Sequence, residues 1–328
     1  EYQGSGTSVA EYAFTFEDEQ TTVELSKADL TDKKELPGSS LKVTDEDGNT
    51  VDEWVSKEEA HIIKGLIVGK KYKMTETKPA DGYVTAESIE FTVENTKEVQ
   101  KHQMLDDVTK VEISKKDITD SSEVPGAKLI ILDKDGKKVE SWTSKDKPHM
   151  VEKLPVGEYT LREEQAPDGY LIAEDVKFTV KDTGKVQKVK MKDAHPYGKL
   201  VIKKTDSTSK AALSGAEFEL REKESGKVVE KLVTDKTGTA TSGKIPIATY
   251  KNGKVEKTVE YILVETKAPN GYELSSKKEE IRFEYKDGKT KVIEIVKEIK
   301  NTKSPSGSTP TGNSPKTGDS TNIWLPIL

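Results

Sequence analysis

The sequence of 328 residues contains no cysteine, only four histidines, three tryptophans and six phenylalanines. Without cysteine the chain can form no disulfide. The histidines have no metal-ligand spacing, and neither a cysteine nor a G-x-S-x-G sequence supports nucleophilic hydrolysis. We therefore expect no metal, no cofactor and no conventional enzyme.

Charge is plentiful but evenly distributed, with 53 Lys and Arg residues against 59 Asp and Glu residues and a formal net charge of -6. Because opposite charges interleave without basic blocks, we expect no nucleic-acid partner. Helical periodicity is nowhere sustained, whereas short strands alternate with turns such as DEDGN (45–49) and DKDGK (133–137). This pattern predicts an all-β fold of sandwich domains. The turns lack the closing glutamate of a calcium loop, so we interpret them as hairpins.

One strand sequence occurs three times, as VELSKAD (23–29), VEISKKD (111–117) and LVIKKTD (200–206). Because side chains alternate faces along a strand, each copy places one lysine on the face of its apolar residues. Burying an ammonium is costly, and the chain has ample surface for lysines, so these positions suggest a reaction. The three inward lysines are Lys27, Lys115 and Lys204.

Two further inward polar positions recur with each lysine. A glutamate shares the face of a tyrosine in segments 72–83, 159–170 and 261–272, and an aspartate or asparagine closes each repeat. Any one of them alone could be a surface residue on a twisted edge strand, but triple recurrence argues against that. The glutamates are Glu76, Glu163 and Glu265, and the closing residues are Asp106, Asp193 and Asn301.

The spacing predicts three tandem domains. The lysines follow one another at intervals of 88 and 89 residues, and in the first two repeats the glutamate precedes the aspartate by 30. The third repeat is longer, which we interpret as an enlarged hairpin or loop around Gly243 to Lys257. The expected limits are 19–108, 109–196 and 197–302, with 1–18 as the tail of an upstream repeat or a linker and 303–328 as a linker with a truncated sorting signal.

Over most of residues 19–302 the chain resembles the collagen-adhesin B-type (CnaB, prealbumin-like, SpaA-type) domains of Gram-positive surface proteins and pilins. The marks are a first-strand lysine two residues before an aspartate, a following L-P-G-S-like segment, and a glutamate box ending in P-x-G-Y. Only the first repeat departs from the last pattern, with KPADGY (78–83). The resemblance implies that the lysine and the last-strand Asp or Asn condense spontaneously into an intramolecular isopeptide bond, assisted by the glutamate.

Burial favours this chemistry, because it lowers the pKa of a lysine toward a neutral amine and raises that of a glutamate toward a neutral acid. The aspartates would release water and the asparagine ammonia. Lys116 and Lys203 are rival candidates for the reacting amines, but the alternation of side chains places them on the outer face. Asp107 is a rival candidate for the place of Asp106, and only the 30-residue spacing disfavours it. The implied bonds are Lys27–Asp106, Lys115–Asp193 and Lys204–Asn301.

The last segment contains S-P-K-T-G, which is similar to an L-P-x-T-G sortase signal with serine in place of leucine. It follows a Ser, Thr, Gly and Pro tract typical of a disordered linker and precedes the apolar run Ile323 to Leu328, so we expect a hydrophobic tail cut short. The serine suggests a variant sortase, such as class B, and a chance match in the linker is the alternative. The signal residues are Ser314, Pro315, Lys316, Thr317 and Gly318.

The first segment also indicates a longer chain, since it begins without methionine or signal peptide. Asp18 precedes Lys27 by nine residues, as Asp106 precedes Lys115. We interpret Asp18 as the orphan cross-link partner of an upstream repeat, with an exposed acidic linker as the alternative.

Together these features predict a monomeric stalk of a secreted adhesin, anchored covalently to peptidoglycan of the Gram-positive cell wall, with an absent upstream region that binds host extracellular matrix. In one alternative the repeats bind matrix themselves, although no aromatic patch stands out. In the other the chain is an accessory pilin subunit. A backbone pilin is disfavoured because no lysine lies in a V-Y-P-K-like motif.

Overall fold

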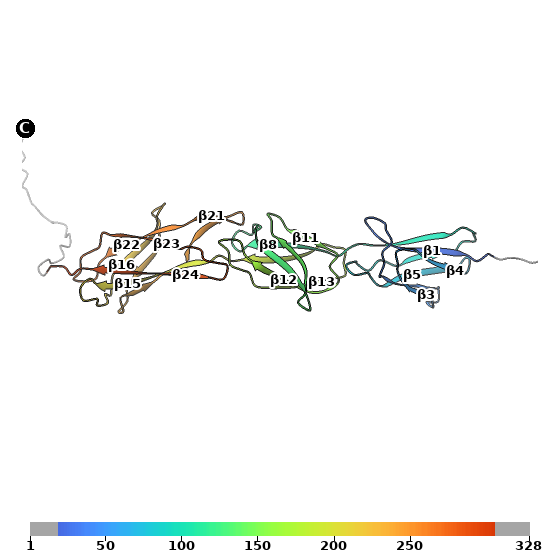
Figure 1. The fold of residues 1–328 in the computed structure, drawn as a ribbon, viewed down its shortest axis with the longest axis horizontal. Coiled ribbons are helices and arrows are strands. Elements are labelled where there is room, and N and C mark those ends of the chain that lie inside the picture. The colour runs from blue at the N-terminus through green and yellow to red at the C-terminus, as the bar shows by residue number, and fades with distance from the viewer. Residues whose placement is uncertain (1–18, 306–328) are drawn as a thin grey trace, which may run out of the picture. The chain divides into compact units, whose positions relative to one another are not determined.

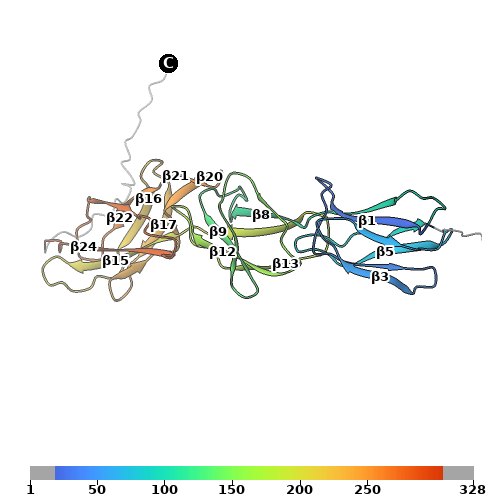
Figure 2. The same cartoon turned by 45° about the vertical axis from the view of Figure 1, so that its right-hand side comes forward.

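The computed structural model describes residues 19–305, so Asp18 and the sorting-signal residues lie outside the described part. The described residues form an all-β structure, drawn in Figures 1 and 2. Within residues 19–305, no helix is long and apolar enough to cross a membrane. The chain divides into two compact units, of which the second combines the third domain with Asp168–Leu171.

Domain 1 is a sandwich of two sheets with strand orders β4-β1-β7 and β3-β2-β5-β6. Its first and last strands, β1 and β7, run parallel, with Lys27 opposite Met104 and Asp29 opposite Asp106. The turn DEDGN closes the β2–β3 hairpin, as expected, and its Gly48 has a φ of 82°. The strands are β1 (Thr22–Asp29), β2 (Ser40–Thr44), β3 (Thr50–Val55), β4 (His61–Lys64), β5 (Lys71–Lys78), β6 (Ile89–Thr92) and β7 (Gln100–Asp106).

Domain 2 repeats this topology, with sheets β11-β8-β14 and β10-β9-β12-β13. Again the first and last strands are parallel neighbours, with Lys115 opposite Met191. The strands are β8 (Lys110–Asp117), β9 (Lys128–Asp133), β10 (Lys138–Thr143), β11 (His149–Glu152), β12 (Gly157–Gln165), β13 (Val176–Val180) and β14 (Gln187–Asp193).

Domain 3 keeps the same plan and adds to it. Its second sheet has the order β17-β16-β22-β23, and β15 lies beside the parallel β24 over ten residue pairs (Figure 1). The extra length forms the β20–β21 hairpin, which confirms the expected enlargement near Gly243 to Lys257. The strands are β15 (Tyr197–Asp206), β16 (Glu217–Glu222), β17 (Val228–Val233), β18 (Thr239–Thr241), β19 (Ile245–Pro246), β20 (Ala248–Lys251), β21 (Lys254–Thr258), β22 (Glu260–Lys267), β23 (Lys278–Arg282) and β24 (Val292–Asn301).

Each domain encloses its own apolar core between its two sheets. Alternate residues of facing strands fill these cores, for example Leu25 on β1 and Met74 on β5, both almost completely buried. Burying one such side chain contributes about 1.5–3 kcal/mol. The recurring histidines have a packing role, because His61 stacks on Trp54 at 4.2 Å and His149 on Trp142 at 4.4 Å between ring centroids. The stacks join strands that belong to opposite sheets.

Candidate cross-linking sites

In domain 3 the lysine and asparagine lie on neighbouring strands of one sheet, and the glutamate approaches from the other sheet. Lys204 Nζ donates to Asn301 Oδ1 and lies 3.0 Å from Glu265 Oε1. Asn301 Nδ2 donates to both oxygens of Glu265, at 3.0 and 3.2 Å. The carboxyl group therefore touches both the attacking amine and the amide that would be attacked.

Domains 1 and 2 hold the same arrangement with aspartate in place of asparagine. Lys27 Nζ contacts Asp106 Oδ1 and lies 3.0 Å from Glu76 Oε1. In domain 2 the lysine contacts the aspartate in the same way, and its amine lies 3.0 Å from the glutamate. The structure thus brings together all nine residues that the sequence analysis singled out. The domain 2 residues are Lys115, Glu163 and Asp193.

All three sites are closed to solvent. The lysines are at most 2% exposed, the glutamates 4%, and the closing residues at most 2%. Ammonium groups are seldom buried to this extent without a partner, and here each amine faces the glutamate and the closing residue. A dry site of this kind strengthens every electrostatic interaction inside it.

Burial shifts the ionisation of these groups in the direction that favours condensation. Desolvation lowers the pKa of Lys204, although nearby Glu265 opposes that shift. Desolvation also raises the pKa of Asp106 to about 7 and that of Asp193 to about 7, with the adjacent glutamates adding to the rise and the lysines opposing it.

Each aspartate site holds two buried carboxyl oxygens that make no hydrogen bond among the described residues. In domain 1 these are Asp106 Oδ2 and Glu76 Oε1, and in domain 2 they are Asp193 Oδ2 and Glu163 Oε1. Glu76 Oε1 nevertheless lies 3.0 Å from Lys27 Nζ. A proton placed between the two carboxyls would satisfy both oxygens and remove one buried charge. In domain 3 the asparagine amide supplies the donor instead.

Three features of the sites were missed by the sequence analysis. First, the ladder register shifts immediately after each glutamate, at Thr77, Glu164 and Thr266, which is the signature of a β-bulge. Bulges re-aim side chains beside active sites. No turn residue or break in alternation marks these positions in the sequence.

Second, a backbone N–H ten residues after each glutamate donates to its Oε2. The distances are 2.7 Å from Ala86, 2.6 Å from Ala173 and 2.9 Å from Ser275. This bond fixes the carboxyl group in place from the loop that follows its strand. The constant ten-residue interval is visible in the sequence, but nothing about those residue types indicates a backbone donor.

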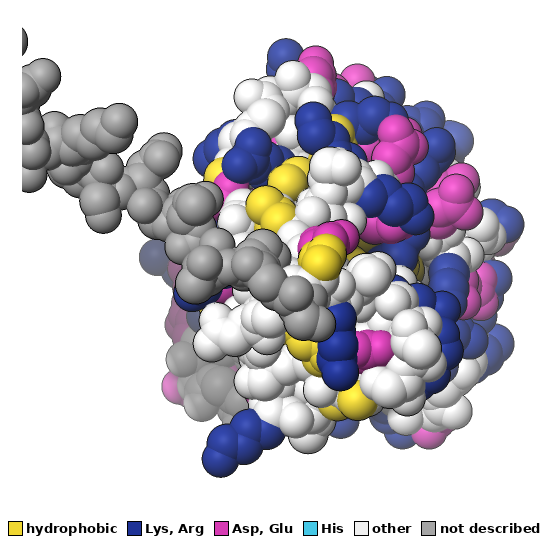
Figure 3. All heavy atoms as spheres, turned by 90° about the vertical axis from the view of Figure 1, so that its left-hand side faces the viewer, with side chains coloured by type: hydrophobic (Ala, Val, Ile, Leu, Met, Phe, Trp, Pro, Cys, Tyr) yellow, Lys and Arg dark blue, Asp and Glu magenta, His cyan; other side chains and the backbone are white. Residues whose placement is uncertain are grey.

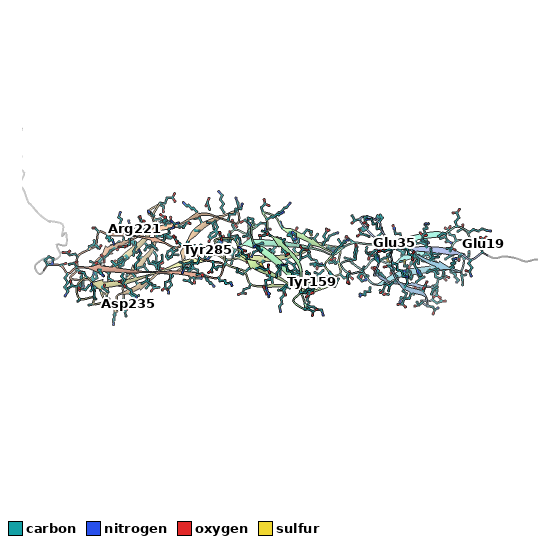
Figure 4. The ribbon with its side chains drawn as sticks, viewed as in Figure 1. Glu19, Glu35, Tyr159, Arg221, Asp235 and Tyr285 are labelled. Carbon is teal, nitrogen blue, oxygen red and sulfur yellow. The ribbon has the colours of Figure 1, made fainter. Side chains whose placement is uncertain are left out.

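Third, a second glutamate supports the reacting lysine in domains 1 and 2. Glu35, labelled in Figure 4, accepts the backbone N–H of Lys27 at 3.2 Å, and Glu123 accepts that of Lys115 at 3.0 Å. In domain 3 the carbonyl of Gly238 accepts the equivalent N–H of Lys204 at 2.7 Å.

The rival residues lie elsewhere. Asp107 accepts bonds from Lys110 Nζ at 2.8 and 2.9 Å, so the structure places Asp106 and not Asp107 beside Lys27. Lys116 pairs with Glu123 at 2.7 Å, and Lys203 is exposed. The alternation of side chains therefore selected the inward lysines correctly.

The model of the SpaA family, described as a prealbumin-like fold domain, matches residues 21–107, 109–195 and 198–299. The chain therefore belongs to the family of SpaA-type prealbumin-like proteins and contains three such domains in tandem. Among curated proteins, none matches this sequence.

Two solved structures are similar to this chain. The Bacillus anthracis TIE protein is 27% identical with a TM-score of 0.57, and the match covers 87% of this chain and 52% of that one. BcpA, the major pilin subunit of Bacillus cereus, is 18% identical with a TM-score of 0.50, and the match covers 87% of this chain and all of that one. The present chain thus spans about half the length of the TIE protein.

Proposed function

We propose that this chain is a covalently stiffened stalk in which each domain closes one intramolecular isopeptide bond. The observation that supports the proposal is the threefold recurrence of an amine, a carboxyl group and an acyl donor in mutual contact and shielded from water. The proposed bonds are Lys27–Asp106, Lys115–Asp193 and Lys204–Asn301.

In the proposed reaction, the neutral lysine Nζ attacks Cγ of the closing residue, and a new C–N bond replaces the bond from Cγ to the leaving group. In domains 1 and 2 the leaving hydroxyl combines with an amine proton and departs as water. In domain 3 the leaving NH2 group of Asn301 takes up an amine proton and departs as ammonia. Each product is a neutral amide, so buried charge is removed.

The glutamate assists by holding and moving protons. Glu265 touches the amine of Lys204 and the amide of Asn301, so it can accept a proton from the first and deliver one to the second. Fixing the groups in contact supplies much of the rate, because it converts an encounter in solution into a unimolecular step. Each site reacts once, so we propose self-modification without turnover and not an enzyme.

The proposed bonds would carry tension past the domain interiors. In domain 1 the bond joins β1 to β7 across 79 residues, so force entering at Lys27 would leave at Asp106 without loading the chain between them. Nine residues later it would enter the next cross-link at Lys115. By the chain-entropy relation used for disulfides, closing a loop of this length stabilises the folded state by about 4.5 kcal/mol.

We further propose that the stalk belongs to a surface adhesin or an accessory pilin, anchored to peptidoglycan by a variant sortase at Thr317–Gly318. One face of the described residues favours a stalk over direct matrix binding. On the face drawn in Figure 3, basic and acidic side chains intermingle and the hydrophobic side chains form small separate groups. Matrix binding by an extended apolar surface therefore has no support on that face of the described residues.

Intact-mass spectrometry tests the proposal. The unaltered protein, without any substitution, should lack two waters and one ammonia relative to the mass of its sequence. Glu163→Ala should lack only one water and the ammonia, because domain 2 loses its proton carrier. The matched control is Glu164→Ala, which removes the exposed neighbouring carboxyl and should leave all three bonds intact. A protein at the full mass of its sequence would refute cross-linking.

A further inference from the structure

In domains 1 and 3 the tyrosine that ends the glutamate box makes a contact that the reaction above does not use. In domain 3 the Tyr272 hydroxyl donates to Asp206 Oδ2 at 2.9 Å, and in domain 1 the Tyr83 hydroxyl donates to Asp29 Oδ2 at 2.7 Å. Each aspartate stands two residues after the reacting lysine, at the end of the same strand. The tyrosine therefore connects the glutamate box to the lysine strand.

The aspartate holds the end of that strand in a fixed turn. Asp206 Oδ1 accepts the backbone N–H groups of Thr208 and Ser209, both at 2.8 Å. In the same turn the N–H of Ser207 donates to the carbonyl of Asn301 at 2.9 Å. Backbone hydrogen bonds and the tyrosine hydroxyl lower the pKa of Asp206 to about 2, so its carboxylate is charged at neutral pH.

The residues after the tyrosine contact Glu265 and the residue that follows Asn301. Glu273 N–H donates to the carbonyl of Thr302, the residue after Asn301, at 2.9 Å. Three residues after the tyrosine, the N–H of Ser275 donates to Glu265 Oε2 at 2.9 Å. One short segment, 272–275, thus contacts the lysine strand, the asparagine strand and the glutamate.

Domain 1 repeats every part of this arrangement. Val84 N–H donates to the carbonyl of Asp107 at 2.9 Å, and Ala86 N–H donates to Glu76 at 2.7 Å. The Tyr83 hydroxyl also accepts a bond from Lys153 of the same compact unit at 2.7 Å. Because the same contacts occur in two separate units, they are part of the domain architecture and not peculiar to one loop.

We propose that the tyrosine–aspartate pair is a positioning device for isopeptide formation: Tyr272 with Asp206, and Tyr83 with Asp29, hold the glutamate in register with the lysine. This inference rests on the proposed function. Neither the tyrosine nor the aspartate of a pair touches the reacting atoms. Both would act through the backbone segment whose N–H donates a hydrogen bond to the glutamate. Misplacing a reacting group by about 1 Å can slow a reaction on the order of 100-fold.

The test measures how fast domain 3 loses ammonia after refolding from denaturant, starting from chains purified unfolded and unreacted. Tyr272→Phe removes only the hydroxyl and should slow the reaction roughly 10-fold or more. Asp206→Asn should slow it comparably. The matched control is Tyr261→Phe, whose hydroxyl donates to the carbonyl of Pro246 at 2.6 Å and makes no contact with Asp206. Bonds in domains 1 and 2 serve as internal references in the same molecule.

If the tyrosine hydroxyls only stabilised the fold, Tyr272→Phe and Tyr261→Phe should slow bond formation equally. Their cost in stability is measured separately in a Lys204→Met background, where no bond can form in domain 3. There we expect both variants to lower the melting temperature by similar amounts. Slower bond formation in Tyr272→Phe alone supports positioning. An unchanged rate of bond formation in Tyr272→Phe, or equal slowing by both variants, would overturn the positioning role while leaving the cross-link itself in place. If the unaltered domain 3 retains its ammonia, the proposed function fails at its first step.

Discussion

Replacing Lys204 by methionine should make domain 3 extensible. Methionine is unbranched and apolar, so it fills much of the space of the lysine stem without leaving an unpaired buried ammonium. Glu265 keeps its hydrogen bonds with Asn301. The substitution therefore removes the proposed cross-link while preserving most of the packing around it.

The expected length change follows from the positions of the two linked residues. Lys204 and Asn301 are 97 residues apart in sequence, and a fully extended chain spans roughly 3.3–3.6 Å per residue. Unfolding the variant under tension should therefore release roughly 320–350 Å that the cross-linked domain withholds. The parallel pairing of β15 and β24 means that force applied at the two ends of the domain shears ten residue pairs together.

Single-molecule force spectroscopy on the whole protein is the direct assay. The unaltered protein should show no step of this length, whereas Lys204→Met should show one such step per molecule. Lys203→Met is the matched control, because it makes the same change at the exposed neighbouring position. A full-length step in the unaltered protein, or none in Lys204→Met, would refute the assigned force path.

The same variant should also lose thermal stability. A loop of this length contributes about 4.7 kcal/mol by the chain-entropy relation. For a domain of this size, each kcal/mol shifts the melting temperature by about 4–8 °C, so the transition of domain 3 should fall by roughly 19–38 °C. Calorimetry of both variants would measure it, and Lys203→Met should stay close to the unaltered protein.

Two further predictions concern pH and packing. Because the pKa of Asp193 is raised to about 7, its carboxyl is protonated below that pH and its hydroxyl can depart as water. Bond formation in domain 2 on refolding should therefore slow as pH rises through about 7. Asp193→Asn should abolish this alkaline decline and release ammonia, and identical pH profiles before and after the change would contradict the assignment. Gly198→Ala should destabilise domain 3 by about 1–3 kcal/mol, since the new Cβ would lie 2.5 Å from the buried Phe283 ring. Gly243→Ala, with no neighbour nearer than 3.7 Å, is its control, and equal melting temperatures for the two would show that the core yields at Phe283.

Sequence reasoning succeeded where a local rule with a fixed period applies. Alternation along a strand has a period of two, so the faces of Lys27 and Glu76 follow from their neighbours alone. The same alternation excluded the exposed neighbour Lys203, and repetition in three copies then argued against surface residues on a twisted edge strand. The β20–β21 hairpin was also foreseeable, because the third repeat has extra residues between its lysine and its glutamate, and these must form additional chain outside the common strands.

Folding in three dimensions decided everything that depends on segments far apart in the chain. The pairing of β1 with β7, which puts Asp106 and not Asp107 beside Lys27, joins residues 79 positions apart, and local sequence does not encode that register. The bulge after each glutamate depends on the pairing of two strands, and the N–H donor ten residues later depends on how the following segment folds back onto the carboxyl group. Which side chains turn inward can therefore be predicted from the residues of one strand, since it is a property of that strand. Which of them meet cannot be predicted in this way, because contact between strands is set by the packing of the whole sandwich.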